Sequence, residues 1–257
     1  MSVIHPTALV DPAAELGRDV TVGPFAILGP RVTLGDGVVI GPRATIERNA
    51  RLAAGVRIGT GSVIGGDPQD LKYRGEETWV EIGAGSVVRE YTTINRGTAA
   101  SGVTRIGEGC FLMSYVHLAH DCQVGDGVII ANGTQLAGHV SIQDRAILSG
   151  LCAVHQFATV GTLAFVGGCS RVSQDIPPFV RAVGNPTELY GLNTVGLQRA
   201  GMPAETMSAL KRVYRLVFNS QLNLSQALER ARDEVPALPE VGLFLEFVGK
   251  SQRGVPA

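Results

Sequence analysis

Four of the five histidines of this chain lie in one short stretch, at His117, His120, His139 and His155, and Asp121 directly follows His120. A neutral imidazole takes up a proton or binds a metal ion near neutral pH. The cluster therefore suits either a metal site or general base catalysis by one histidine, with the others binding substrate. The pair His120–Asp121 favours the base, because a carboxylate close to an imidazole fixes its tautomer. Side chains of neighbouring residues on an extended chain point apart, so the geometry of the folded chain decides whether this contact forms.

The segments that position these histidines follow a six-residue period. Every sixth residue from Ile4 to Val172 is Ile, Leu or Val, except at Asp70, Glu76 and Ala100. Two residues before each of these aliphatic residues stands Ala, Ser, Val, Thr or Cys, and Gly often follows directly. A period of six fits neither a helix nor a flat strand and predicts a hexapeptide β-solenoid. A β-sandwich with chance periodicity is the alternative, which an unbroken frame of this length disfavours.

The predicted solenoid brings the histidines onto one face. Three hexads form one coil, so residues eighteen apart stack in consecutive coils. Leu118, Leu136 and Val154 have this spacing and open the hexads of His120, His139 and His155. The γ-class carbonic anhydrases bind zinc on solenoids of this kind but space their histidines differently. We therefore expect a histidine base, no metal and no cofactor.

Two polar segments interrupt the hexads without shifting their frame. They are residues 65–79 and 95–105, and both are rich in turn-forming residues. The spacing on either side remains a multiple of six. We expect both to be loops on the solenoid wall, where binding groups commonly collect.

The chain divides into two predicted domains, a β-solenoid over residues 1–186 and a helical domain over residues 187–257. Three prolines within residues 173–186 end the repeat. Aliphatic and aromatic residues then follow helical spacing, at Met207, Leu210, Tyr214, Val217, Leu224, Leu228 and Leu243–Phe247. We expect these helices to cap the open end of the solenoid or to pack between subunits.

Composition narrows the location and the partners. A net charge of −1 and a pI near 6.5 argue against a nucleic-acid partner, and no apolar run approaches the ~20 residues of a transmembrane segment. The repeat begins at Ile4, so we expect no signal peptide and a cytoplasmic protein. Cys110, Cys122 and Cys152 occupy small inward positions, as expected for core residues in a reducing compartment. Cys169 lies outside that pattern.

Several motifs resemble the UDP-N-acetylglucosamine O-acyltransferase family, which catalyses the first step of lipid A biosynthesis. They are IHPTA (4–8), PQDLKY (68–73), TINRGT (93–98), AHDCQVG (119–125), LAGHV (136–140), AVHQF (153–157), VGGCS (166–170) and QDIPPF (174–179). The resemblance covers nearly the whole chain. It implies a left-handed parallel β-helix with a C-terminal α-helical domain, and a homotrimer with active sites between subunits. It also implies transfer of an (R)-3-hydroxyacyl chain from acyl carrier protein to the 3-OH of UDP-N-acetylglucosamine.

The resemblance also implies residue roles. His120 would be the general base, supported by Asp121, and the backbone N–H of Gly138 would stabilise the oxyanion. His155 and Gly168 would measure the acyl chain, and the absence of a side chain at Gly168 favours a longer chain. The residues implied to bind the sugar nucleotide are Asp70, Lys72, His117, His139, Gln156, Asn193 and Arg199.

One stretch departs from the family pattern. Residues 191–201 keep Asn193 and Arg199, but Val195 and Ala200 replace an acidic and a second basic residue. Losing such a charged contact weakens binding by about 1–3 kcal/mol. An acceptor with an amine in place of the 3-OH therefore remains open.

Other functions also remain as alternatives. The later N-acyltransferase of the same pathway carries a uridine-binding domain before its solenoid, whereas the repeats here begin at Ile4. A scaffold without catalysis would not need a histidine column. The partner carrier protein is acidic, so Arg199, Lys211, Arg212 and Arg215 form either its docking patch or merely a solvated helix face.

Overall fold

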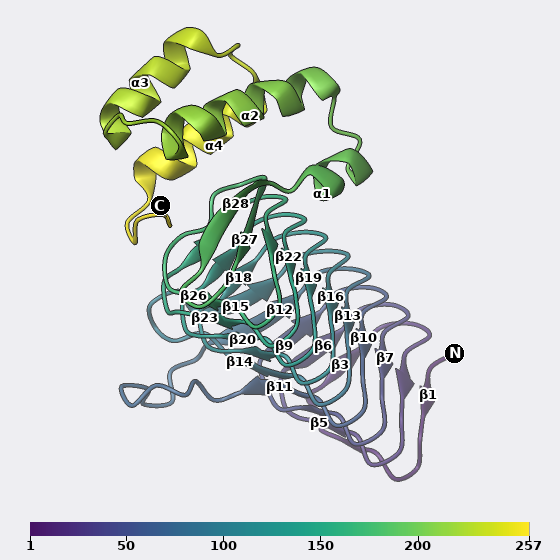
Figure 1. The fold of residues 1–257 in the computed structure, drawn as a ribbon. Coiled ribbons are helices and arrows are strands. Elements are labelled where there is room, and N and C mark those ends of the chain that lie inside the picture. The colour runs from purple at the N-terminus through teal and green to yellow at the C-terminus, as the bar shows by residue number, and fades with distance from the viewer. Residues whose placement is uncertain (257) are drawn as a thin grey trace.

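The six-residue period folds into short strands separated by tight corners, which wind into a left-handed parallel β-helix. Figure 1 shows the resulting prism of stacked coils in a computed structural model that describes residues 1–256. Consecutive coils pair in parallel register, with Leu118 beside Leu136 and Leu136 beside Val154. The predicted stacking of residues eighteen apart is therefore confirmed.

The three faces of the prism are three sheets. Sheet A contains β1 (Val3–Ile4), β4 (Thr21–Val22), β7 (Val39–Ile40), β10 (Arg57–Ile58), β13 (Val87–Val88), β16 (Phe111–Leu112), β19 (Ile129–Ile130), β22 (Ile147–Leu148), β25 (Phe165–Val166), β27 (Val180–Val183) and β28 (Glu188–Leu192). Sheet B contains β2 (Leu9–Val10), β5 (Ile27–Leu28), β8 (Thr45–Ile46), β11 (Val63–Gly66), β14 (Thr93–Asn95), β17 (His117–Leu118), β20 (Gln135–Leu136), β23 (Ala153–Val154) and β26 (Arg171–Val172). Sheet C contains β3 (Glu15–Leu16), β6 (Val32–Leu34), β9 (Ala50–Leu52), β12 (Trp79–Ile82), β15 (Val103–Ile106), β18 (Gln123–Val124), β21 (Ser141–Ile142) and β24 (Thr159–Val160).

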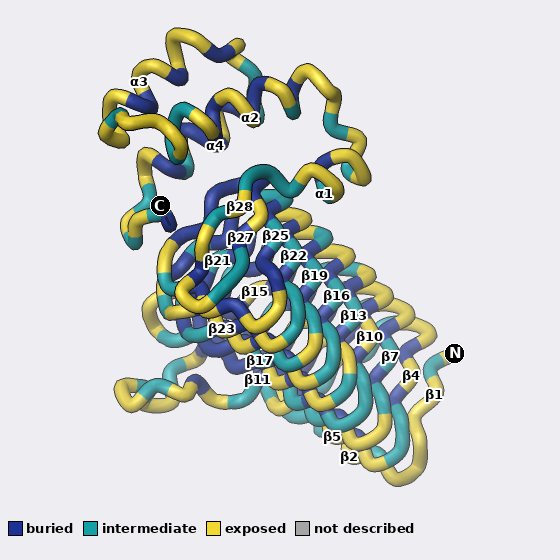
Figure 2. The backbone as a smooth tube through the Cα atoms, viewed as in Figure 1, coloured by how far each residue is buried: buried dark blue, intermediate teal, exposed yellow. Residues whose placement is uncertain are grey.

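The interior of the prism is filled by the aliphatic residues of the repeat. From β4 to β26 the large aliphatic residue of each hexad is buried, and Figure 2 shows buried segments in dark blue recurring along the stacked coils. The small inward residues are buried too, including Cys110, Cys122 and Cys152. Burial raises the pKa of the Cys122 thiol to about 12, so this cysteine is a core residue and no nucleophile.

Corners between sheets use left-handed backbone conformations. We call the corner between sheets A and B the AB corner, and the corner between sheets B and C the BC corner. Tyr91, Tyr115 and Leu151 have positive φ at the AB corner, and Asp121 and His139 do so at the BC corner. A positive φ turns the chain sharply, and it changes the direction of the side chain relative to an extended strand.

Both interruptions of the repeat leave the prism at the BC corner. The first loop (residues 67–78) joins β11 to β12, and the second loop (residues 96–102) joins β14 to β15. Figure 1 shows the first loop as the long excursion beside β11. Each is shorter than the segment expected from sequence, because β12, β14 and β15 extend into the polar stretches.

The C-terminal part begins with a hairpin rather than a helix. β27 pairs with β25 in parallel and with β28 in antiparallel, which extends sheet A past residue 186. The helices that follow are α1 (Thr194–Arg199), α2 (Ala204–Phe218), α3 (Leu224–Glu234) and α4 (Pro239–Lys250). They lie beyond the β27–β28 end of the prism (Figure 1).

Several hydrogen bonds tie the C-terminal part of the chain to the prism. The Tyr214 hydroxyl on α2 accepts a hydrogen bond from the Gly191 N–H and donates one to the Leu189 carbonyl. After α4 the chain returns to the solenoid, where Ser251 donates to the Asp175 carboxylate at 2.6 Å. None of the helices among residues 1–256 is long and apolar enough to cross a membrane.

Candidate active site

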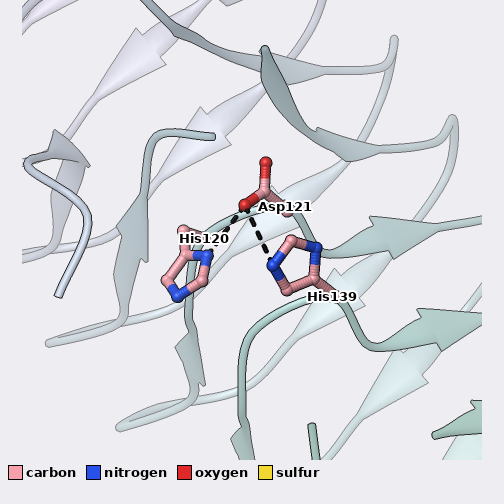
Figure 3. A group of neighbouring side chains, drawn as sticks. All are labelled: His120, Asp121 and His139. Atoms are coloured by element: carbon pink, nitrogen blue, oxygen red, sulfur yellow. Dashed lines mark hydrogen bonds and ion pairs between the residues drawn. The ribbon is translucent and has the colours of Figure 1, made fainter. Parts of the chain in front are cut away.

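His120 and Asp121 lie at the BC corner, in contact with each other (Figure 3). The His120 Nδ1 atom is 2.8 Å from the Asp121 Oδ2 atom, and both side chains are buried. Asp121 has a φ of 62°, so it stands at a left-handed corner and not on an extended strand. The corner therefore supplies the turn that this contact between neighbouring residues requires.

The second loop surrounds the Asp121 carboxylate with donors. The Thr98 backbone N–H and the Ser101 hydroxyl donate to Oδ1, and the Thr98 hydroxyl donates to Oδ2 at 2.7 Å. Burial acts to raise the pKa of Asp121, but the hydrogen bonds from Ser101, His120 and Thr98 outweigh it and lower this pKa to about 2. The carboxylate is therefore ionised near neutral pH.

The sequence reasoning did not single out Thr98 and Ser101. The sequence signal for these two residues is the interruption of the hexads at residues 95–105. It lies just before the coil that carries His120, and it supplies the loop that folds over Asp121.

His139 completes the cluster one coil further on. Its Nε2 atom is 3.5 Å from the Asp121 Oδ2 atom, and its ring meets the His120 ring edge to face at 5.1 Å. On its other side His139 stacks against Phe157, with ring centroids 4.7 Å apart. These contacts hold both imidazoles in fixed orientations.

His120, Asp121 and His139 are close enough to hold a metal ion, since their ligand atoms lie within 4.8 Å of one another. A carboxylate offers about four lone-pair positions. Asp121 already accepts four hydrogen bonds, from the Thr98 N–H, the Thr98 and Ser101 hydroxyls and His120. The donor set therefore suits an imidazole base better than a metal.

Gly138 lies against the His120 ring. A Cβ atom at Gly138 would be 2.6 Å from the His120 Cε1 atom and 2.8 Å from Nε2. Glycine is thus required here by the ring and not by the backbone, whose φ is not positive. Within residues 1–256 the Gly138 N–H has no hydrogen-bond acceptor, so it is free to bind a ligand beside His120 Nε2.

The other predicted histidines flank this cluster on sheet B. The His117 Nδ1 atom is 2.7 Å from the Thr93 hydroxyl, and burial lowers the pKa of His117. A neutral His117 is therefore a hydrogen-bonding group and not a cation near pH 7. His155 is exposed at the end of β23 and contacts the Gln156 carbonyl, which places both residues at the same corner two coils above His120.

The first loop, which leaves the prism at the BC corner, carries Asp70 and Lys72. The Asp70 Oδ1 atom accepts a hydrogen bond from the Lys72 N–H at 2.9 Å, which closes a small turn. The Lys72 side chain is exposed. The loop leaves sheet B two strands before His117, because β11 pairs with β14 and β14 with β17.

Three predicted residues lie away from the histidines within one chain. Gly168 lies at the AB corner next to the Gly150 carbonyl. Asn193 and Arg199 line a cavity over the outer face of sheet A, together with Val195 and Ala200. Asn193 is also the N-cap of α1, where it accepts from the Gly196 N–H and donates to the Leu163 carbonyl.

Family models and known proteins match this chain over nearly its whole length. Residues 175–256 match the model described as UDP N-acetylglucosamine O-acyltransferase, domain 2, and residues 13–48 and 104–138 match bacterial transferase hexapeptide repeats. The chain is 50% identical over 261 residues to the acyl-[acyl-carrier-protein]–UDP-N-acetylglucosamine O-acyltransferase of Verminephrobacter eiseniae, and 99% of each chain is covered. The enzyme of that name from Anaeromyxobacter dehalogenans is 47% identical over 253 residues, covering 98% of each chain.

The fold also matches a solved structure over its full length. The UDP-N-acetylglucosamine acyltransferase of Bacteroides fragilis superposes with a TM-score of 0.98 at 41% identity, covering 99% of this chain and 100% of that one. The agreement includes the C-terminal helices as well as the prism.

Proposed function

The chain belongs to the UDP-N-acetylglucosamine O-acyltransferase family, and we propose that His120 is the general base of this reaction, with Asp121 and Gly138 as its partners. The protein is an acyltransferase that moves an acyl chain from acyl carrier protein to UDP-N-acetylglucosamine. The acyl chain is an (R)-3-hydroxyacyl group and the acceptor is the 3-OH of the sugar. The observation that carries the proposal is the contact between His120 Nδ1 and the ionised Asp121.

This contact assigns the tautomer of His120. An ionised carboxylate accepts the proton of Nδ1, which leaves the lone pair on Nε2. Nε2 lies beside Gly138, where an added Cβ atom would be only 2.8 Å away. There it accepts the proton of the sugar 3-OH while the sugar oxygen attacks the thioester carbon. The imidazolium that forms is stabilised by Asp121.

The thioester oxygen becomes an oxyanion during the attack. The free N–H of Gly138 stabilises this charge, in a role that contributes about 3 kcal/mol in other acyl-transfer sites. The tetrahedral intermediate collapses, the C–S bond breaks, and the imidazolium returns its proton to the carrier thiolate. No covalent enzyme intermediate is required, because a thioester is already activated.

The remaining residues of the BC corner bind the acceptor. His117, His139 and Gln156 contact the sugar, and Asp70 and Lys72 of the first loop hold the sugar and its phosphates. A neutral His117 suits a hydroxyl or amide partner. His155 and Gly168 bound the acyl chain, and Gly168 leaves room for a longer one.

The active enzyme is a homotrimer with each site shared between two subunits. Asn193 and Arg199 lie over sheet A, away from the BC corner of their own chain. In the trimer, these residues of one subunit reach the BC corner of the neighbouring subunit. Two surfaces support this assembly. The outer face of sheet A is apolar, at Val87, Phe111, Ile129, Ile147 and Phe165, and the AB corner exposes Phe25, Tyr91, Tyr115 and Leu151. Apolar surface of this extent is typical of an interface between proteins.

The acyl donor docks on the basic face of α2. Lys211 and Arg215 are exposed there beside a groove with Ser208, whereas Arg212 is paired with Glu234 at 3.1 Å. Docking of an acidic carrier on this face makes the rate fall with rising salt. A cytoplasmic location is supported by the free cysteines of the chain.

An assay of the purified protein tests the function. UDP-N-acetylglucosamine and its 3-amino analogue are each offered with hydroxyacyl carrier proteins of several chain lengths. Ester formation on the hydroxyl sugar is expected, with Val195 and Ala200 as tolerated changes. Transfer to the amine alone would replace the ester by an amide product, and transfer to neither would refute the enzyme assignment.

A further inference from the structure

Arg96 is a positively charged side chain that is wholly buried, at 0% exposure. It follows β14 directly, at the start of the second loop. An arginine loses its hydration when it is buried, so it remains there only if other groups replace that hydration. The partners of Arg96 therefore indicate what it holds in place.

These partners all belong to the first loop or to its entrance. The Arg96 Nη1 atom donates to the Gly65 carbonyl, and Nη2 donates to the Asp67 carboxylate and to the Tyr73 hydroxyl, the latter at 3.1 Å. The Arg96 backbone N–H donates to the Gly66 carbonyl at 2.9 Å. One guanidinium thus contacts both the beginning and the middle of a loop without regular structure.

We call the contacts of Arg96 with Gly65, Asp67 and Tyr73 the Arg96 clamp. Neighbouring groups add further hydrogen bonds to it. The Asn95 side chain donates to the Asp67 carbonyl at 2.7 Å, and Arg48 of the preceding coil donates to the Asp67 carboxylate at 3.0 Å. The Tyr73 hydroxyl donates in turn to the Glu76 carbonyl at 3.0 Å. Burial acts to raise the pKa of Asp67, yet the hydrogen bonds from Arg48 and Arg96 lower it.

The clamp encloses the residues that the acceptor requires. Asp70 and Lys72 lie between Asp67 and Tyr73, the two loop side chains that Arg96 holds. The remaining freedom of this short segment is reduced further by the turn between Asp70 and Lys72. A loop fixed in its binding conformation before the ligand arrives loses less entropy on binding.

Arg96 is itself held rigidly, because the chain beyond it packs against sheet C. A Cβ atom at Gly97 would be 2.4 Å from the Val103 N atom, and the Gly97 N–H donates to the Trp79 carbonyl. The next residue, Thr98, is bonded to Asp121. Residues 95–98 thus contact the first loop on one side and, on the other, the Asp121 carboxylate that pairs with His120.

We propose that Arg96 is a positioning residue for acceptor binding, which fixes the first loop from beneath so that Asp70 and Lys72 face the sugar nucleotide. The identity of the ligand rests on the proposed function. Arg96 touches no substrate, and its effect is carried by Asp67 and Tyr73.

The test weakens the clamp from its loop side, since replacing a buried arginine risks the fold. Asp67→Asn removes the charge that faces Arg96, and Tyr73→Phe removes one hydroxyl. Glu77→Gln is the matched control, because Glu77 lies in the same loop but pairs with Arg31 on the surface. The variants are compared in steady-state kinetics with both substrates, and in limited trypsin digestion without substrate.

Trypsin reports loop order independently of activity, since Lys72 and Arg74 are exposed cleavage sites inside the first loop. For Asp67→Asn we expect about a tenfold higher KM for UDP-N-acetylglucosamine and a similar acceleration of cleavage, as for a lost charged hydrogen bond. For Tyr73→Phe we expect about threefold in each. The kcat, the KM for the acyl donor and the melting temperature stay close to those of the Glu77→Gln control.

An unchanged acceptor KM in both variants overturns the proposal, whatever the digestion shows. A fall in melting temperature with kcat and both KM values unchanged also overturns it, because the clamp then serves only stability. If the parent protein does not acylate UDP-N-acetylglucosamine but trypsin still cleaves the first loop faster in Asp67→Asn and Tyr73→Phe, the clamp is supported and the proposed function is refuted.

Discussion

The AB and BC corners of the prism share one backbone conformation and differ in chemistry. Tyr115 at the AB corner has a φ of 63°, and Asp121 at the BC corner has a φ of 62°. Asp121 is buried among donors from the second loop, whereas Tyr115 is 61% exposed and stacks on Tyr91. The Asp121 carboxylate is thus fully hydrogen-bonded within one chain, whereas the aromatic side chains of the AB corner remain exposed in the part of the chain that the structure describes.

This difference shows what a repeat provides and what it leaves open. The hexads supply equivalent frames at each corner, with residues stacked coil upon coil. The function of each corner depends on the residues that depart from the repeat. At the BC corner these are the two inserted loops, and at the AB corner they are the exposed aromatic side chains. We therefore expect changes at the BC corner to impair chemistry, and changes at the AB corner to impair assembly.

The largest effect is expected for His120→Ala. Removing a general base lowers the rate by about 10²–10⁴-fold. Asp121 keeps its hydrogen bonds to Thr98 and Ser101, so the fold and the subunit assembly should persist. Turnover with both substrates and the molar mass in solution are the measurements. His5→Ala, in the first coil, is the control with unchanged turnover, and retained activity in His120→Ala would refute the base assignment.

The two corners can be compared through equivalent glycines. Gly138 precedes His139 at the BC corner, and Gly150 precedes Leu151 at the AB corner. An added Cβ would meet the His120 ring at 2.6 Å in the first case and only the Asn132 carbonyl at 3.3 Å in the second. Gly138→Ala should lower kcat about 10²-fold, as for a displaced catalytic group. Gly150→Ala should change kcat little, and equal losses would mean that the effect is structural.

Tyr115→Asp tests the AB corner as a subunit interface. A central aromatic side chain of an interface contributes about 2 kcal/mol to association, or about thirtyfold in affinity. The variant should dissociate at micromolar concentration and lose activity in parallel, and light scattering after gel filtration measures its mass. Ser141→Asp on the outer face of sheet C is the control. A fully assembled Tyr115→Asp protein would exclude this corner from the interface.

The smallest effect concerns acid stability. The pKa of Asp121 is about 2 in the folded chain against an ordinary 3.8. A lowered pKa stabilises the fold above pH 3.8, and this contribution is lost as the pH falls towards 2. The melting temperature of the wild type should therefore fall more steeply between pH 4 and pH 2 than that of Asp121→Asn. Parallel curves would show that Asp121 is not held as an anion.

Much of the fold can be predicted from the sequence, because the repeat converts residue number into position. The spacing of Leu118, Leu136 and Val154 predicted the histidine column, and that stacking is present. The loops were predicted at the breaks in the hexads. The roles assigned to the site residues are still predictions, which the experiments above test.

Other features depend on tertiary contacts that no repeat encodes. Arg96 stands in a polar segment and looks like a solvated loop residue, yet it is buried because the first loop folds over it. The hairpin of β27 and β28 begins within the proline-rich residues 173–186, where no hydrophobic period indicates strands. Asn193 matches a binding position in the family, and here its side chain also caps α1.

The most direct test of the central claim is the structure of the protein with UDP-N-acetylglucosamine bound. The quantity of interest is the distance from the sugar 3-OH oxygen to His120 Nε2. We expect about 2.6–3.2 Å, the range for a proton transfer to a base, with Lys72 directed to the phosphates. A 3-OH that is directed to another residue, with His120 Nε2 facing no substrate atom, would contradict the account.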